Sequence, residues 1–381
     1  MVPASPLCRR IVMKKMGLYI HIPFCKSKCN YCNFYSYCAD ENEYNTYIDA
    51  LISSIIAHGK TYRNRTVDTV YFGGGTPSAL GTDRLNRILH AVINAFVIAS
   101  DAEITFEANP TSADALDFVG LKEAGFNRIS FGLQSANDNE LKILGRRHTA
   151  EEAKEVIYAS QNAGFDNLSL DLILCVPEQT KESLKNSIDF AASCGVQHIS
   201  AYILKIEEGT PFDKIKGSLS LPTDDEQSEI YEYAVNLLEE YGYAQYEISN
   251  FAKPGFESRH NLRYWYDEEY LGLGPSAHSF IDGKRFYYPD DIKEFYANNT
   301  VFESTGGDSD EYMMLRLRLK EGLNFQQYRE RFGKNVDDRI IRKASSLLPE
   351  QLVELSDDSL RLTVKGFLVS NAIIAYLLDN T

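Results

Sequence analysis

The sequence contains no long hydrophobic run. None of its apolar segments approaches the roughly 20 residues that cross a bilayer as a helix, and the N-terminal stretch MVPASPLCRRIVMKKM lacks the apolar core of a signal peptide. We therefore expect a cytoplasmic protein with no transmembrane segment. In that reducing compartment the seven cysteines are expected to be thiols, and the three that cluster near the N-terminus predict metal binding rather than disulfides.

Basic residues are also scarce. Lysine and arginine number 39 against 54 aspartates and glutamates, which gives a net charge of −15 and a pI near 5.0. A chain of this sign repels polyanions at long range, so we expect no nucleic-acid partner. The 44% hydrophobic and 24% charged residues are typical of a globular enzyme, and no internal repeat is present.

Short β-rich runs alternate with longer helical patterns from Gly17 to about Ser249. This alternation is typical of βα units around a parallel sheet. Strands are expected at residues 17–22, 67–72, 103–107, 127–131, 168–174 and 198–204. Thr149 and Thr223, each followed by a glutamate three residues later, predict helix starts with capping boxes. Six parallel strands form either an open doubly wound sheet or a partial barrel, and functional groups gather at their carboxyl ends in both cases.

We expect four parts along the chain. They are a leader over residues 1–16, a domain of βα units over 17–250, a connecting segment over 251–304 and a smaller C-terminal domain over 305–381. The connecting segment is rich in tyrosine and is expected to be irregular, and TGGDSD at 305–310 is typical of a linker. Predicted helices at 311–319, 338–348 and 365–378, with a hairpin over 352–363, indicate an α+β, winged-helix-like domain. The acidic charge favours a packing role for it over DNA binding.

Three cysteines have C-x3-C-x2-C spacing directly after the first expected strand, in the run HIPFCKSKCNYC. Cys25, Cys29 and Cys32 can ligate three irons of a cubane and leave the fourth iron open. Structural zinc is the alternative, but it usually takes four protein ligands, and no fourth cysteine or histidine lies at ordinary zinc spacing. The other four cysteines are expected to be unligated.

Polar or glycine-rich motifs follow the other expected strands. Residues 73–77 read GGGTP, 107–110 read EANP and 132–135 read GLQS, while Asp171 lies in the fifth strand. A glycine run lets the backbone approach a ligand and offers amide donors, although alone it equally fits a tight turn. Their shared position at strand ends predicts a single site at the mouth of the barrel.

With these motifs the sequence resembles the radical S-adenosylmethionine superfamily and its partial (β/α)6 barrel. The resemblance implies a [4Fe-4S] cluster whose open iron is chelated by the amino and carboxylate groups of S-adenosylmethionine. Reduction of the cluster would then cleave the sulfonium and release methionine and a 5'-deoxyadenosyl radical. The positions that contact S-adenosylmethionine in that family are occupied here by Tyr19, Tyr31, Gly74, Gly75, Thr76, Glu107, Gln134, Arg146 and Asp171.

More narrowly, YIHIPFC, YFGGGTPS, EANP, FGLQS and HNLRYW resemble the oxygen-independent coproporphyrinogen III oxidase family over nearly the whole chain. True oxidases of that family carry an extra cysteine two residues after the third ligand and a longer N-terminal arm. This chain has Phe34 at that position and only 16 residues before its first expected strand. Both departures favour the other branch, the heme chaperones called HemW. This branch binds heme and does not oxidise coproporphyrinogen.

The H-N-x-x-Y-W pattern of that branch occupies residues 260–265. If this segment is helical, the histidine and the tyrosine lie four residues apart on one face, and the asparagine and the tryptophan lie beside them. Because histidine can ligate heme iron and aromatic rings can stack on a porphyrin, the resemblance predicts heme contacts by His260, Asn261, Tyr264 and Trp265. A packed, hydrogen-bonded histidine and a tryptophan that anchors the core are the structural alternative.

Two functions follow from this resemblance. A HemW-like chaperone would bind heme, deliver it to acceptor proteins and take electrons for its cluster from a donor. An oxidase would instead decarboxylate coproporphyrinogen III to protoporphyrinogen IX by radical chemistry. The residue at position 34 favours the chaperone, with cleavage of S-adenosylmethionine expected and oxidation of coproporphyrinogen not expected.

Overall fold

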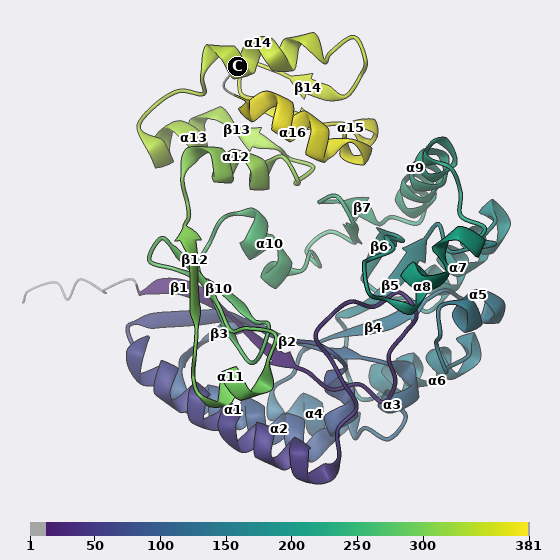
Figure 1. Ribbon diagram of the computed structural model, residues 1–381, viewed down its shortest axis with the longest axis vertical. Coiled ribbons are helices and arrows are strands. Elements are labelled where there is room, and N and C mark those ends of the chain that lie inside the picture. The colour runs from purple at the N-terminus through teal and green to yellow at the C-terminus, as the bar shows by residue number, and fades with distance from the viewer. Residues whose placement is uncertain (1–12, 380–381) are drawn as a thin grey trace, which may run out of the picture.

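The computed structural model describes residues 13–379, and its central feature is a parallel sheet (Figure 1). The six expected strands are all confirmed. They are β1 Lys14–Ile22, β2 Arg65–Gly74, β3 Val97–Ala108, β4 Arg128–Gln134, β5 Leu168–Leu174 and β6 His198–Ile203, and each is parallel to the next. The expected leader falls mostly outside the described residues, and β1 begins at Lys14, earlier than predicted.

Helices cover the outer face of these strands. They are α1 Glu41–Thr61, α2 Thr82–Ala95, α3 Pro110–Ala113, α4 Phe118–Ala124, α5 Asp138–Ile143, α6 Ala150–Asn162, α7 Lys181–Ser193, α8 Pro211–Ile215 and α9 Asp224–Glu240, with short 3-10 turns η1 Pro77–Leu80 and η2 Lys216–Ser218. The capping boxes predicted at Thr149 and Thr223 are both present, at the starts of α6 and α9.

The two faces of the strands differ in chemistry. On β1, Leu18, Ile20 and Ile22 are fully buried in the core that the helices share. Tyr19 and His21 alternate with them and therefore point to the opposite, inner face of the sheet. The inner face is thus lined by polar and aromatic side chains, and this is where a ligand site can form.

Residues 251–304 were expected to be irregular, and this expectation is wrong. The sheet continues at both edges through β7 Ala244–Gln245, β8 Asn250–Ala252, β9 Tyr270–Leu273, β10 His278–Ile281, β11 Lys284–Tyr287 and β12 Val301–Thr305, with α10 Arg259–Trp265 and α11 Ile292–Tyr296 between them. These strands have two to five residues, too few to show a period, and β9 gains its partner by pairing with the distant β1.

The completed sheet is open. Its twelve strands follow the order β12-β11-β10-β9-β1-β2-β3-β4-β5-β6-β8-β7, so within residues 13–379 β12 and β7 are edges that do not meet. The sequence left an open sheet or a partial barrel as alternatives, and the structure shows a curved sheet that does not close. Within the same residues, no helix combines the length and apolar character that crossing a membrane requires.

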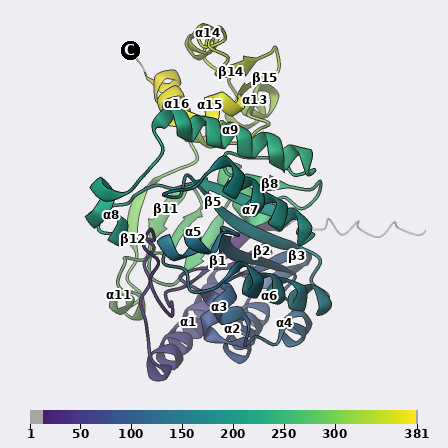
Figure 2. The same ribbon diagram turned by 90° about the vertical axis from the view of Figure 1, so that its right-hand side faces the viewer.

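A smaller α+β unit forms the C-terminal part. It contains α12 Ser309–Arg316, β13 Leu323–Asn324, α13 Phe325–Phe332, α14 Asp338–Ser346, β14 Val353–Leu355, β15 Ser359–Leu362, α15 Val364–Leu368 and α16 Ser370–Leu378. The predicted hairpin is β14–β15, and β13 adds a third antiparallel strand. The expected single terminal helix is instead broken at Val369, because α15 packs on α9 and α16 packs on α14 (Figure 2).

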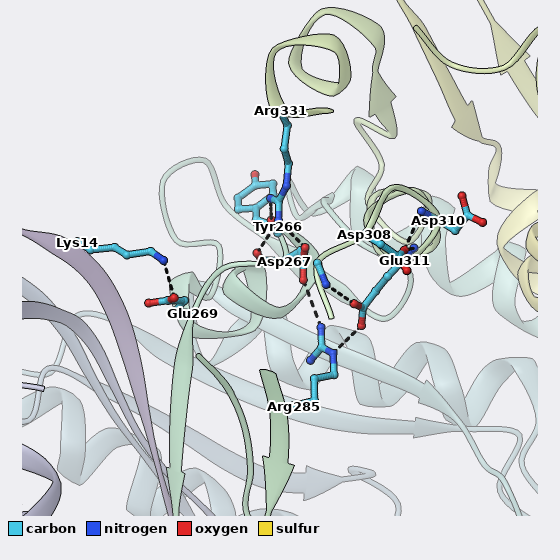
Figure 3. A network of polar contacts seen from close by, with 10 residues as sticks. Lys14, Tyr266, Asp267, Glu269, Arg285, Asp308, Asp310, Glu311 and Arg331 are labelled. Atoms are coloured by element: carbon cyan, nitrogen blue, oxygen red, sulfur yellow. Dashed lines mark hydrogen bonds and ion pairs between the residues drawn. The ribbon is translucent and has the colours of Figure 1, made fainter. Parts of the chain in front are cut away.

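Asp267 joins this C-terminal unit to the sheet (Figure 3). Its carboxylate, whose side chain is 0% exposed, is 3.2 Å from Arg285 on β11 and 2.5 Å from Arg331 on α13. Glu311 on α12 completes the network with an ion pair of 2.6 Å to Arg285. One buried carboxylate therefore neutralises two arginines from different parts of the fold.

Replacement of Asp267 by alanine is expected to lower the free energy of unfolding by about 3 kcal/mol, because two arginines lose their shared counter-charge. Urea unfolding followed by circular dichroism measures this change. The matched control is D310A, since Asp310 is exposed in the same network region and should stay within about 0.5 kcal/mol of the wild type. Equal stability of D267A and D310A would show that the network does not stabilise the fold.

Candidate functional site

A cavity of about 390 Å³ lies at the carboxyl ends of the parallel strands. The structure brings eleven of the predicted cluster and S-adenosylmethionine residues to its wall. They are Cys25, Cys29, Tyr31, Cys32, Gly74, Gly75, Thr76, Glu107, Gln134, Arg146 and Asp171. These residues are spread over nearly 150 positions of the sequence, and the parallel strands place them in one site.

The cysteine loop follows β1 and is fixed at both ends. The amide of Cys25 donates to the carbonyl of Tyr37 at 3.0 Å, and Asn30 is held by backbone and side-chain bonds to the end of α5. Cys25, Cys29 and Cys32 are half-buried free thiols. Burial, together with the nearby Cys29 and Cys25, raises the pKa of Cys32, which shows that the sulfurs share one environment.

The donor set fits a cubane. Within the described residues, no three histidine, cysteine or acidic side chains converge closely enough to bind one metal ion. A [4Fe-4S] cluster does not need such convergence, since each thiolate binds its own iron. The cavity that these thiols border would hold a ligand next to the cluster.

Arg146 connects the cysteine loop to the opposite wall. Its Nη1 lies 3.6 Å from the sulfur of Cys29 and its Nη2 donates to the carbonyl of Gly132, while its buried Nε has no partner. A Cβ at residue 132 would lie 2.9 Å from the Gln134 amide nitrogen and 3.1 Å from the Arg146 guanidinium, so a larger residue would shift these two side chains. An arginine with a free donor at a cavity wall suits a ligand carboxylate.

The glycine run forms the floor beneath the cysteine loop. Gly74 has φ of +106°, and a Cβ there would lie 2.5 Å from the His21 ring. The amide of Thr76 donates to the carbonyl of Phe24 at 2.7 Å, and its hydroxyl lies 3.2 Å from the sulfur of Cys25. This run therefore packs directly against the predicted cluster ligands, a contact that other residues at position 74 would disrupt.

Two acids face the cavity from β3 and β5, the strands on either side of β4. Glu107 on β3 accepts a hydrogen bond of 2.9 Å from Tyr71, and Asp171 on β5 accepts one of 3.3 Å from Ser130. Burial and then the charge of Asp171 raise the pKa of Glu107 to about 7, and burial also raises the pKa of Asp171. Such acceptors suit a cationic ligand or ribose hydroxyls.

Tyr19 is the exception among the predicted contacts. It does not line the cavity; its hydroxyl is 3.2 Å from Nδ1 of His21, and its ring stacks beside Tyr71 at 6.3 Å. It lies behind the residues that form the wall, so in this conformation any effect on a ligand passes through those neighbours.

The H-N-x-x-Y-W motif lies on α10, so the segment is helical, and its histidine points away from solvent. His260 is 1% exposed, and its ring nitrogens lie 2.8 Å from the Thr69 hydroxyl and 2.9 Å from the Tyr264 hydroxyl. Its ring also stacks on Tyr71 at 5.2 Å. Burial, with nearby arginines, lowers the pKa of His260 to about 3, so the ring is neutral. Heme ligation by this ring would require one of these bonds to break.

The remaining motif residues are more accessible. Asn261, Tyr264 and Trp265 are all half-buried on α10. This helix lies between the sheet and the C-terminal unit (Figure 1). Tyr264 contacts both the buried His260 ring, at 2.9 Å through its hydroxyl, and Tyr270, so it links the buried histidine to the accessible side of the motif.

Replacing His260 by alanine is expected to lower the free energy of unfolding by about 2 to 4 kcal/mol, because a buried ring and two hydrogen bonds are lost. Urea unfolding of the metal-free protein measures the loss. His278, which is 53% exposed on β10, is the control, and H278A should remain within about 0.5 kcal/mol of the wild type. An H260A variant with the same free energy of unfolding as the wild type would show that this histidine does not stabilise the fold.

Sequence reasoning missed several residues of the site. Ser130 and Tyr202 line the cavity, and Arg128 lies buried on the same strand as Ser130. All three have alternating positions on strands that were correctly predicted, so the inward face of each strand was the signal that could have found them.

Comparison with known proteins places this geometry in a family. The model of the radical SAM superfamily matches residues 19–191, and that of the HemN C-terminal domain matches residues 310–369. The solved structure of coproporphyrinogen III oxidase (HemN) from Escherichia coli superposes with a TM-score of 0.82 and 22% identity, covering 96% of this chain and 90% of that chain. This likeness confirms the fold.

Relatives with higher sequence identity than that oxidase are named heme chaperones. The heme chaperone HemW of Bacillus subtilis (strain 168) is 35% identical over 372 residues, covering 94% of this chain and 98% of that protein. HemW of Mycobacterium tuberculosis (strain H37Rv) is 36% identical, with 95% and 94% covered, and HemW of Escherichia coli (strain K12) is 39% identical, with 72% and 73% covered. The chain therefore belongs to the radical SAM superfamily and, within it, to the HemW family.

Proposed function

We propose that this protein is a heme chaperone that carries a [4Fe-4S] cluster on Cys25, Cys29 and Cys32 and binds S-adenosylmethionine in the adjoining cavity. The observation that carries the proposal is the joint placement of three free thiols, an arginine with an unpaired donor and two buried acids around one cavity. When bound, the cluster and S-adenosylmethionine supply one-electron cleavage of a carbon–sulfur bond.

The protein's own residues divide the work of binding. Arg146 is placed to pair with the ligand carboxylate, and Glu107 and Asp171 are placed to accept hydrogen bonds from amino or hydroxyl groups. Gln134 lies at the end of β4 with φ of +72° and lines the cavity. Gly74, Gly75 and Thr76 offer backbone close to the ligand, and Tyr31 closes the side next to the cysteines.

Heme binding is proposed for α10. Asn261, Tyr264 and Trp265 offer a half-buried face with two aromatic rings, which can stack on a porphyrin. Ligation of the iron by His260 stays a prediction that requires its internal bonds to open. Acceptor proteins would receive the heme, an electron donor would reduce the cluster, and a cytoplasmic location fits the use of reduced thiols.

Heme titration under strict anaerobiosis tests the proposal. The protein is expected to bind heme with a shifted Soret band, and W265A should weaken this binding while leaving the iron content unchanged. Coproporphyrinogen III is offered in parallel with a reductant and S-adenosylmethionine. Formation of vinyl products would overturn the chaperone assignment in favour of the oxidase. The absence of any heme binding would also contradict the chaperone assignment.

A further inference from the structure

Arg128 is a buried cation that the proposed binding of S-adenosylmethionine does not yet use. It is the first residue of β4 and is 1% exposed. Among the fully buried side chains of the described residues, it has the largest volume. Within residues 13–379 its Nε has no hydrogen-bond partner, and no carboxylate forms an ion pair with its guanidinium. An unpaired charge in a protein interior is costly, so its retention calls for a physical reason.

Strand register places this arginine beneath the cavity. Arg128 and Ser130 are two residues apart on β4, so both point to the inner face of the sheet. Ser130 lines the cavity, lies in register with Glu107, and donates to Asp171. Arg128 is therefore one layer below the residue that lies between the two buried acids.

The charge of Arg128 acts on both acids without touching them. Burial raises the pKa of Glu107 and of Asp171, and the positive charge of Arg128 is among the influences that lower both pKa values. Glu107 and Asp171 also repel each other, since the charge of Asp171 raises the pKa of Glu107. A fixed cation below the pair offsets this repulsion.

The other groups that face these charges are neutral near physiological pH. Burial raises the pKa of Tyr19, Tyr71, Tyr202, Tyr246 and Tyr264. Burial lowers the pKa of His198 and His260, with the charge of Arg128 adding to the effect. Arg146, whose charge reaches Asp171 from the opposite wall, is the other cation, and it faces the cysteine loop.

We propose that Arg128 is a positioning residue of the S-adenosylmethionine site, whose fixed charge favours the ionised forms of Glu107 and Asp171 so that the cavity accepts a cationic sulfonium ligand. The inference rests on the proposed function. It assigns Arg128 an electrostatic role through the two acids, with no contact to the ligand. The charge of the side chain, rather than its shape, is then what the site requires.

Binding of S-adenosylmethionine to the cluster-loaded protein, measured by equilibrium dialysis between about pH 6 and pH 9, tests this role. Loss of the charge in R128M and in R128Q is expected to move the midpoint of the pH dependence upward by about one unit and so to weaken binding about fivefold near pH 7. Binding by these variants should recover near pH 9. R128K keeps the charge and should retain a midpoint close to that of the wild type.

A purely structural role predicts a different pattern. Equal weakening of R128M, R128Q and R128K at every pH would overturn the inference, and so would neutral variants whose pH profile matches the wild type. If one neutral variant does not fold, the other and R128K give the same comparison. Failure of the wild type itself to bind S-adenosylmethionine would contradict the proposed function, and the inference would fall with it.

Discussion

Replacement of Cys29 by alanine is expected to leave the anaerobically reconstituted protein almost without iron. The wild type should hold about four irons per chain, and a cubane that loses one of only three protein ligands is not retained. Cys29 is also the sulfur that Arg146 approaches, at 3.6 Å. Iron and sulfide analysis, with the visible absorbance of the cluster, measures the loss.

The same loop supplies the control. Cys38 is an exposed free thiol whose sulfur contacts the carbonyl of Lys26 at 3.5 Å. The variant C38A should bind iron like the wild type. Normal iron content in C29A, or equal losses in C29A and C38A, would remove the predicted ligand set.

Replacement of Glu107 by glutamine is expected to weaken S-adenosylmethionine binding about tenfold at pH 8 and to flatten its pH dependence. Burial, followed by the charge of Asp171, raises the pKa of Glu107 to about 7 in the ligand-free protein. The sulfonium is a permanent cation, so it is attracted by the ionised carboxylate and not by the protonated acid. Wild-type affinity should therefore fall as the pH drops through about 7, by up to tenfold per unit.

Equilibrium dialysis of the cluster-loaded proteins at several pH values measures both effects. E107Q should keep only the pH dependence that Asp171 contributes. The control is D101N, because Asp101 lies on the same strand with a side chain that is 75% exposed, and its binding should match the wild type. A slope in E107Q as steep as that of the wild type would show that another group controls the titration.

The sequence predicted the parallel strands because each combines a buried β-rich run with a helical pattern after it. It also indicated the cavity, since cysteine, glycine and acidic motifs recur where these strands end. Local pattern was sufficient there, because parallel topology brings all carboxyl ends to one edge. The contacts of these residues with S-adenosylmethionine stay predictions.

Features that depend on pairing between residues far apart in the sequence could not be predicted from local pattern. The strands between residues 250 and 305 gain their stability from partners such as β1, and a span of two to five residues carries no period. The position of Tyr19 behind the wall and the burial of His260 on the sheet-facing side of α10 both follow from packing between β1, β2 and that helix. The unpaired Arg128 is likewise visible only once the inner layers are assembled.

Electron paramagnetic resonance of the reduced, reconstituted protein, recorded with and without S-adenosylmethionine, tests the central claim most directly. Three thiolates that leave one iron open predict the signal of a reduced [4Fe-4S] cluster whose g values change when the ligand occupies that iron. A cluster signal that S-adenosylmethionine leaves unchanged, or thiols that take up zinc and no iron, would contradict the account.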